Sequence, residues 1–181
     1  MKDKTTIITV AITLVLVAIM VGIFAIGTKS QMTTPTSANP IGDKHPDLGQ
    51  KHINQGDQHA AYNSDLPSSG PHYSPAAPWG IKTTELPDET LVHNLEHGGI
   101  EIAYKPDMSQ AQVEALNKLV AALPASSKFN EIKAILVPRV TNTRPIELAA
   151  WSYTLNLDTV DSAKITEFYN GHLDKGPELV P

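Results

Sequence analysis

Histidine is concentrated in one part of this sequence, and two of the histidines share a helical spacing. Six of the seven lie between His45 and His97. The segment 91–99, LVHNLEHGG, places His93, Glu96 and His97 within five residues. Side chains four residues apart project from the same side of a helix. His93 and His97 could therefore bind one metal ion, because imidazole is a ligand for zinc, copper, nickel and iron.

The remaining ligands of such a site would come from the segment just upstream. His72 follows Gly70 and Pro71, a pair that predicts a tight, stiff turn. His59 is the natural fourth ligand, and Glu96 could either bind the metal or orient a histidine through a hydrogen bond. The predicted metal ligands are thus His59, His72, His93 and His97.

The alternative to metal binding is that these histidines are ordinary polar residues on a solvated surface. It suits a single histidine, and we apply it to His45 and His52, which lie nearer the N-terminal segment. His172 falls at the end of the last predicted helix, where a partly positive imidazole favours the helix dipole. For the histidines at 72, 93 and 97 taken together, the spacing favours metal binding.

His93 to His97 also fits the H-x-x-E-H pattern of inverzincin peptidases. In that pattern two histidines bind zinc and the glutamate activates water. The predicted helix ends at once in Gly98-Gly99, and no downstream glutamate stands out as a third ligand. A zinc-dependent hydrolase is therefore an alternative, and we expect a binding protein rather than an enzyme.

A short helix over residues 88–97 would present this motif. Leu91, Val92 and Leu95 fall within one arc of about 100°, which predicts a stripe that faces the core. His93 and His97 lie on nearly the opposite side. The Pro- and His-rich segment 51–84 is the obvious cover for that side, because its four prolines at 67, 71, 75 and 78 forbid a long helix.

The rest of the chain predicts an α+β domain. Strands are expected at 99–104, 132–138 and 146–155, and helices from Ser109, with Gln112 completing a capping box, and over 161–173. The sequence as a whole predicts the α+β class, with an N-terminal transmembrane helix followed by one compact domain. In that domain we expect a small mixed β-sheet packed by two or three helices, with a long Pro/His-rich N-terminal loop.

The N-terminus predicts a membrane anchor. Residues 5–26 carry no charge and would span about 33 Å as a helix, enough for a hydrocarbon core of roughly 30 Å. Lys2 and Lys4 precede this run, so the N-terminus is expected in the cytoplasm and the domain outside it. A cleaved signal peptide is the alternative. We expect an anchor within 1–27, a flexible tether over 28–50 and an extracytoplasmic domain over 51–181, in a single-pass protein of the cell membrane.

Composition excludes several classes of protein. The net charge of -5 argues against a nucleic-acid partner, because such proteins need a basic surface. The absence of cysteine excludes disulfides, thiolate zinc sites and iron–sulfur clusters. A chain without thiols also suits an oxidising compartment.

The segments GDQHAAYNSDLPSSGPHY and ETLVHNLEHGGIEIAYKPD closely resemble the family called domain of unknown function 3105. The later AAW and the closing GPE are similar to the C-terminal half of that family. The resemblance implies a bacterial or archaeal extracytoplasmic domain behind one membrane anchor, and it implies no activity. It singles out His59, Tyr62, Ser69, Gly70, His72, His93, Glu96, His97, Gly98 and Tyr104. Among these we expect Glu96, Tyr62 and Tyr104 to surround the metal ligands.

These observations predict a membrane-anchored, extracytoplasmic metal-binding protein that acts in metal handling or in an envelope redox assembly. Copper is favoured over zinc because of the affinity order and the all-nitrogen ligand set. A protein-interaction module without metal is the first alternative, and the zinc hydrolase is the second. An envelope protein partner of unknown identity would fit the first two functions.

Overall fold

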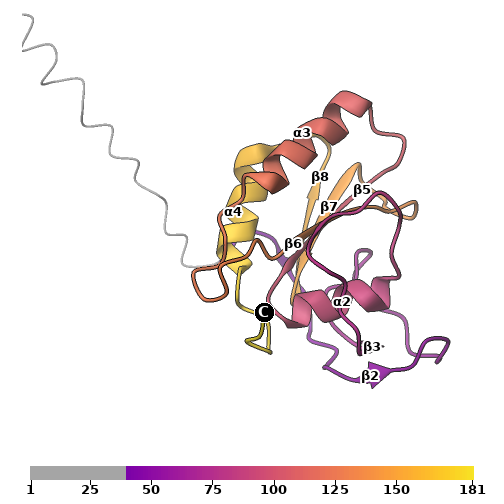
Figure 1. The fold of residues 1–181 in the computed structure, drawn as a ribbon. Coiled ribbons are helices and arrows are strands. Elements are labelled where there is room, and N and C mark those ends of the chain that lie inside the picture. The colour runs from indigo at the N-terminus through magenta and orange to yellow at the C-terminus, as the bar shows by residue number, and fades with distance from the viewer. Residues whose placement is uncertain (1–39) are drawn as a thin grey trace, which may run out of the picture. The chain divides into compact units, whose positions relative to one another are not determined.

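A six-stranded mixed sheet forms the centre of the structure, a computed structural model that describes residues 40–181 (Figure 1). Its strand order is β1-β8-β7-β5-β6-β4. The strands β4, β5 and β6 run parallel, and β1, β7 and β8 add antiparallel pairs. Their bounds are β1 (Asp43–Lys44), β4 (Gly80–Ile81), β5 (Ile100–Tyr104), β6 (Ala134–Pro138), β7 (Ile146–Ala150) and β8 (Tyr153–Leu157).

Helices cover both faces of this sheet. The helices α3 (Gln110–Ala121) and α4 (Ser162–His172) pack on the face that carries Ile100 and Ile102. The helix α2 (Asp88–Glu96) packs on the other face (Figure 1), where Leu91 and Leu95 belong to one buried cluster with Ala103. Successive residues of a strand point to opposite faces, so the alternation in β5 assigns one face to each layer.

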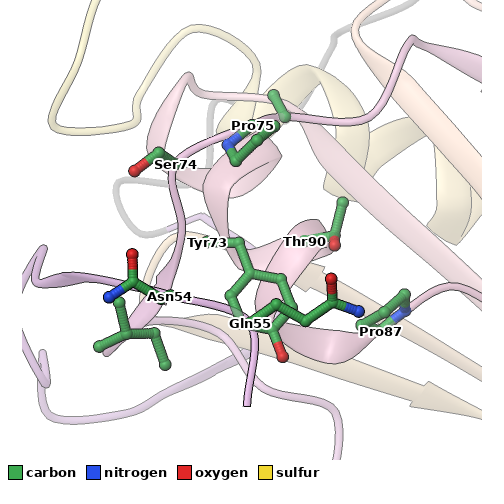
Figure 2. Close-up of a pocket in the computed structure, with 9 residues that line it drawn as sticks. Asn54, Gln55, Tyr73, Ser74, Pro75, Pro87 and Thr90 are labelled. Atoms are coloured by element: carbon green, nitrogen blue, oxygen red, sulfur yellow. The ribbon is translucent and has the colours of Figure 1, made fainter. Parts of the chain in front are cut away.

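A second, two-stranded sheet lies beside α2. The strands β2 (His52–Ile53) and β3 (His72–Tyr73) pair in parallel, with His52 opposite His72. The segments that follow them face the first turn of α2 across a pocket (Figure 2). The Pro/His-rich segment is therefore ordered, and it contributes strands of its own as well as the cover that was predicted for α2.

The predicted strand over 146–155 is corrected to a hairpin. The chain turns at Trp151 and Ser152, and β7 and β8 pair on either side of that turn. Ser152 adopts a left-handed conformation with φ of 62°, and its N–H donates to the carbonyl oxygen of Ser68. The turn holds neither glycine nor asparagine, the usual signals. A tertiary contact stabilises it instead, and sequence alone could not reveal that.

The structure corrects the predicted fold class. Residues 40–181 form a mixed-sheet domain with three helices, and none of these helices is long and apolar enough to cross a membrane. The predicted transmembrane segment 5–26 lies outside the described residues. Residues 43–45, which fall within the predicted tether, belong to the folded domain, because β1 pairs with β8 and the His45 ring bonds Thr154 Oγ1 at 2.7 Å.

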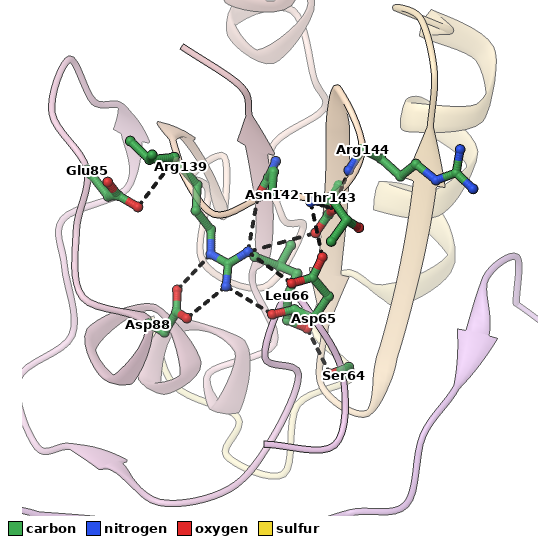
Figure 3. A network of polar contacts seen from close by, with 11 residues as sticks. Ser64, Asp65, Leu66, Glu85, Asp88, Arg139, Asn142, Thr143 and Arg144 are labelled. Atoms are coloured by element: carbon green, nitrogen blue, oxygen red, sulfur yellow. Dashed lines mark hydrogen bonds and ion pairs between the residues drawn. The ribbon is translucent and has the colours of Figure 1, made fainter. Parts of the chain in front are cut away.

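A buried arginine ties the sheet to α2 and to the loop before it (Figure 3). Arg139 donates through Nε and Nη2 to both carboxylate oxygens of Asp88, each at 3.0 Å, and through Nη2 to the carbonyl oxygen of Asp65. Asp88 is the first residue of α2, and its side chain binds Arg139 and makes no capping hydrogen bond. Bidentate pairs of this kind fix orientation as well as adding stability.

Glu101 is buried near this arginine, and one of its carboxylate oxygens has no hydrogen-bond partner among the described residues. The residue is 2% exposed on β5, and the unpaired oxygen is Oε1. Burial raises the pKa of Glu101 well above its ordinary value, and the charges of Asp88 and Glu147 add to the effect, against a lowering by Arg139. A carboxyl group with a raised pKa stabilises the fold below its unfolded-state pKa and loses that contribution as the pH rises.

We expect Glu101→Gln to raise the melting temperature by about 2–5 °C at pH 8, and to change it little at pH 5. The amide is neutral at both pH values, so it removes the cost of ionising a buried carboxyl. Glu114→Gln, an exposed change on α3, is the control and should have no such pH dependence. Thermal unfolding followed by circular dichroism measures the difference, and equal shifts at both pH values would contradict the assignment.

Candidate metal centre

Two local structures bring four side chains to one point. The register of β2 and β3 sets His52 directly opposite His72, and the N–H of His72 donates to the carbonyl oxygen of Lys51. On α2, His93 and Glu96 are three residues apart and project from the same side. The two-stranded sheet packs against this side of the helix, so both pairs of side chains meet between β3 and α2.

The four side chains form a cluster of metal-ligand type. One ligand atom from each of His52, His72, His93 and Glu96 lies within 4.8 Å of all the others. The ring centroids of the three histidines are 4.8 to 5.1 Å apart. Ligands bound at about 2.1 Å lie at most about 4.2 Å apart, so the cluster needs only a small contraction to hold one ion.

Backbone carbonyls fix the orientation of two of these rings. Nδ1 of His72 lies 2.7 Å from the carbonyl oxygen of Gly70, and Nδ1 of His93 lies 2.9 Å from that of Tyr73. A carbonyl oxygen only accepts, so Nδ1 carries the proton in both rings. The lone pair of each neutral ring is then on Nε2. Metal-binding histidines are commonly held in this way by a hydrogen bond from the other ring nitrogen.

The contact between His72 and Glu96 needs a cation. Nε2 of His72 lies 3.0 Å from Oε2 of Glu96, and both residues are almost fully buried. With Nδ1 bonded to Gly70, a neutral His72 would point a lone pair at a carboxylate. A proton or a metal ion between the two atoms resolves the conflict, because unpaired buried acceptors are costly. The donor set therefore fits a metal ion.

The electrostatics favour neutral imidazole at the helix. Burial lowers the pKa of His93, and the neighbouring His97 and His72 lower it further. A histidine must be neutral to bind a metal, so a lowered pKa leaves the lone pair of His93 free at neutral pH. His52 has a side chain that is 46% exposed, and it forms the open side of the cluster.

The turn that carries His72 is built around Gly70. Its φ of +124° is a conformation that other residues rarely adopt. A Cβ at this position would lie 3.2 Å from the ring of Tyr62 and from Leu48. Burial raises the pKa of Tyr62, whose hydroxyl donates to the carbonyl oxygen of Pro71 at 2.6 Å. Tyr62 therefore braces the turn and has no direct role at the cluster.

Asn94 attaches the loop to the helix, a role that sequence analysis missed. Its Oδ1 accepts from the N–H of Ala77 at 2.9 Å, and its Nδ2 donates to the carbonyl oxygen of Ala77 at 2.8 Å. Asn94 lies between two predicted ligands and is 2% exposed. A buried amide in a helix interior is the signal that could have found it, since such a group needs partners.

The structure brings together only part of the predicted ligand set. His72 and His93 are in the cluster, and Glu96 lies there as a ligand candidate. His59 lies instead beside Glu89, with Nε2 to Oε1 at 3.3 Å. His97 Nε2 faces the Glu178 carboxylate at 3.8 Å.

Two further positions differ from the prediction. His52, expected on the surface, supplies the third histidine of the cluster. Tyr104, expected near the ligands, packs against the core on the α3 and α4 face, because strand alternation places it with Ile100 and Ile102.

The arrangement of Glu96 weakens the peptidase interpretation. That mechanism needs His93 and His97 on zinc and a glutamate free to activate water. Here Glu96 is itself among the clustered ligand atoms, and His97 is outside that group. The H-x-x-E-H pattern therefore does not have the geometry of an inverzincin site in this fold.

The comparison with known families agrees with the extent of this domain. A family model described as a protein of unknown function, DUF3105, matches residues 52–180, and the chain belongs to that family. The match begins at His52, the first ligand candidate of the cluster. No curated protein and no solved structure matches the chain.

We expect Gly70→Ala to destabilise the protein by about 1–3 kcal/mol, because the new Cβ is strained by its φ and crowds Tyr62 and Leu48. Gly56→Ala is the matched control: Gly56 also has a positive φ, of +92°, and a Cβ there meets nothing within 4 Å. Urea unfolding of both variants measures the difference. Equal losses of stability would show that crowding at the His72 turn is unimportant.

Proposed function

We propose that this DUF3105 protein binds one transition-metal ion through His52, His72, His93 and Glu96, and that it serves to hold or transfer that metal. One observation carries the proposal. Two buried imidazoles, His72 and His93, have Nδ1 bonded to backbone carbonyls, so neither ring carries a proton on Nε2 while it is neutral. Nε2 of His72 nevertheless lies 3.0 Å from the buried carboxylate of Glu96. Acceptors that are held pointing at one another repel, and a cation bound at the point where they converge removes that repulsion.

Copper is the metal we favour. Three imidazoles and one carboxylate suit a divalent ion, and the affinity order of divalent metals peaks at Cu²⁺. Glu96 replaces the fourth imidazole of the sequence prediction, which reduces the nitrogen share of the site and makes zinc a closer competitor. A thiolate-based copper site is excluded, because the sequence has no cysteine.

The exposure of the site fits metal handling better than catalysis. His52 is the open side of the cluster, so an ion could enter or leave by displacing one exposed ring. The carboxylate that could act as a base is among the ligands. We place this role outside the cytoplasm, in metal supply or in an envelope redox assembly with a protein partner. The cysteine-free sequence supports that location.

A protein-interaction module without metal is the competing function. In that case a proton would lie between His72 and Glu96, and the cluster would only hold β3 on the helix. A metal that binds the native state alone must stabilise it, by about 2.7 kcal/mol at a hundred times Kd. The two functions therefore differ in whether a chelator changes the stability of the protein.

We expect the purified full-length protein to retain one equivalent of metal, and His93→Ala to lose it. His97→Ala is the matched control, since it removes a histidine from the end of the same helix but outside the cluster. Elemental analysis by mass spectrometry measures content, and electron paramagnetic resonance identifies Cu²⁺ bound by nitrogen. Equal retention in the two variants would contradict the ligand assignment, and zinc in place of copper would revise only the metal.

We also expect a chelator to lower the melting temperature of the wild-type protein, and to leave that of His93→Ala unchanged. The physical reason is the loss of a ligand that binds only the folded state. Differential scanning calorimetry before and after dialysis against the chelator measures the effect. An unchanged melting temperature in the wild type would favour the interaction module.

A further inference from the structure

A pocket of about 430 Å³ lies between the ends of β2 and β3 and the first turn of α2. Successive strand residues point to opposite faces. His52 and His72 therefore face the cluster, whereas Ile53 and Tyr73 line the pocket. The first turn of α2 supplies another wall through Thr90. The volume is in the range of sites that bind small ligands or short segments of chain.

The residues that line the pocket favour an uncharged ligand. None of the described residues that line the pocket is Asp, Glu, Lys, Arg or His. Ile53, Tyr73, Pro75 and Pro87 supply apolar surface, and the amide of Gln55 reaches past the Tyr73 ring toward Pro87 (Figure 2). A charged ligand would lose hydration here without gaining a partner of opposite charge.

We propose that this pocket binds a short, uncharged, proline-containing peptide segment of a partner protein. A peptide group needs one donor and one acceptor, and the Gln55 amide offers both. The flat faces of a tyrosine ring and of prolines suit an extended segment that is already stiffened by proline. A saccharide is the competing occupant, because Asn54, Ser74 and Thr90 also bring hydrogen-bonding groups to the wall.

Tyr73 connects the pocket with the metal centre. Its ring lines the pocket, and its carbonyl oxygen accepts the Nδ1 hydrogen bond of His93. The two sites share no ligand-binding side chain. The peptide site is therefore a separate proposal from the metal site, and it is tested on metal-free protein.

The test is a titration of the isotope-labelled, metal-free, full-length protein with acetyl-Gln-Pro-Gln-amide, followed by backbone amide signals in nuclear magnetic resonance. We expect saturable shifts at residues 53–55, 73–74 and 90, and weaker binding of acetyl-Glu-Pro-Glu-amide. Tyr73→Leu should weaken binding about three- to tenfold, which is the effect of losing one aromatic contact.

Gln55→Lys provides a gain of function that misfolding could not produce. It should strengthen binding of the acidic peptide by about threefold or more, because it places a cation in an uncharged wall. Gln58→Lys makes the same change three residues away, outside the lining, and should not. Absence of saturable shifts at millimolar peptide, or equal effects of the two lysine variants, would overturn the proposal. Shifts caused by maltotriose and not by peptide would overturn its peptide assignment.

Discussion

Two backbone carbonyls determine what the histidine cluster can do. The carbonyl oxygens of Gly70 and Tyr73 accept the Nδ1 protons of His72 and His93, so both rings present Nε2 as an acceptor. Without its bond to Gly70, the His72 ring could carry its proton on Nε2 and donate to Glu96 as an ordinary polar contact. The conformation of residues 70–73 therefore converts three polar residues into a set that needs a cation, and the positive φ of Gly70 makes that conformation accessible.

The same segment has few other reasons to be ordered. The strands β2 and β3 are two residues long, and an isolated ladder of that length is not stable by itself. Ordering such a loop costs conformational entropy, which the surrounding contacts must offset. The amide of Asn94, the hydroxyl of Tyr62 and the guanidinium of Arg139 each bind loop backbone. The histidine cluster joins β2, β3 and α2 directly, and so adds a connection that Asn94, Tyr62 and Arg139 do not make.

Sequence reasoning found those parts of the site that local geometry determines. The helical spacing identified His93, and the glycine–proline turn identified His72. The same spacing predicted His97 as the second helix ligand and gave Glu96 only as an alternative ligand or as a hydrogen-bond partner of a histidine. The choice between His52 and His59 could not be made in this way. It depends on which residue of a distant segment pairs with His72, and a register between two-residue strands leaves no periodic pattern. The hairpin at Trp151 and the pairing of β1 escaped prediction for the same reason, since non-local contacts hold both.

The choice between Glu96 and His97 follows from where the helix ends. Positions three and four residues after His93 lie on the same side of a helix, so the pattern allows either. α2 ends at Glu96, and Lys133 donates to the carbonyl oxygens of both His97 and Val180. This buried lysine holds the C-terminal segment against the helix end, where Glu178 lies within 3.8 Å of His97. His97 thus belongs to the contact with the C-terminal segment, and Glu96 is left as the helix residue that completes the cluster with His93.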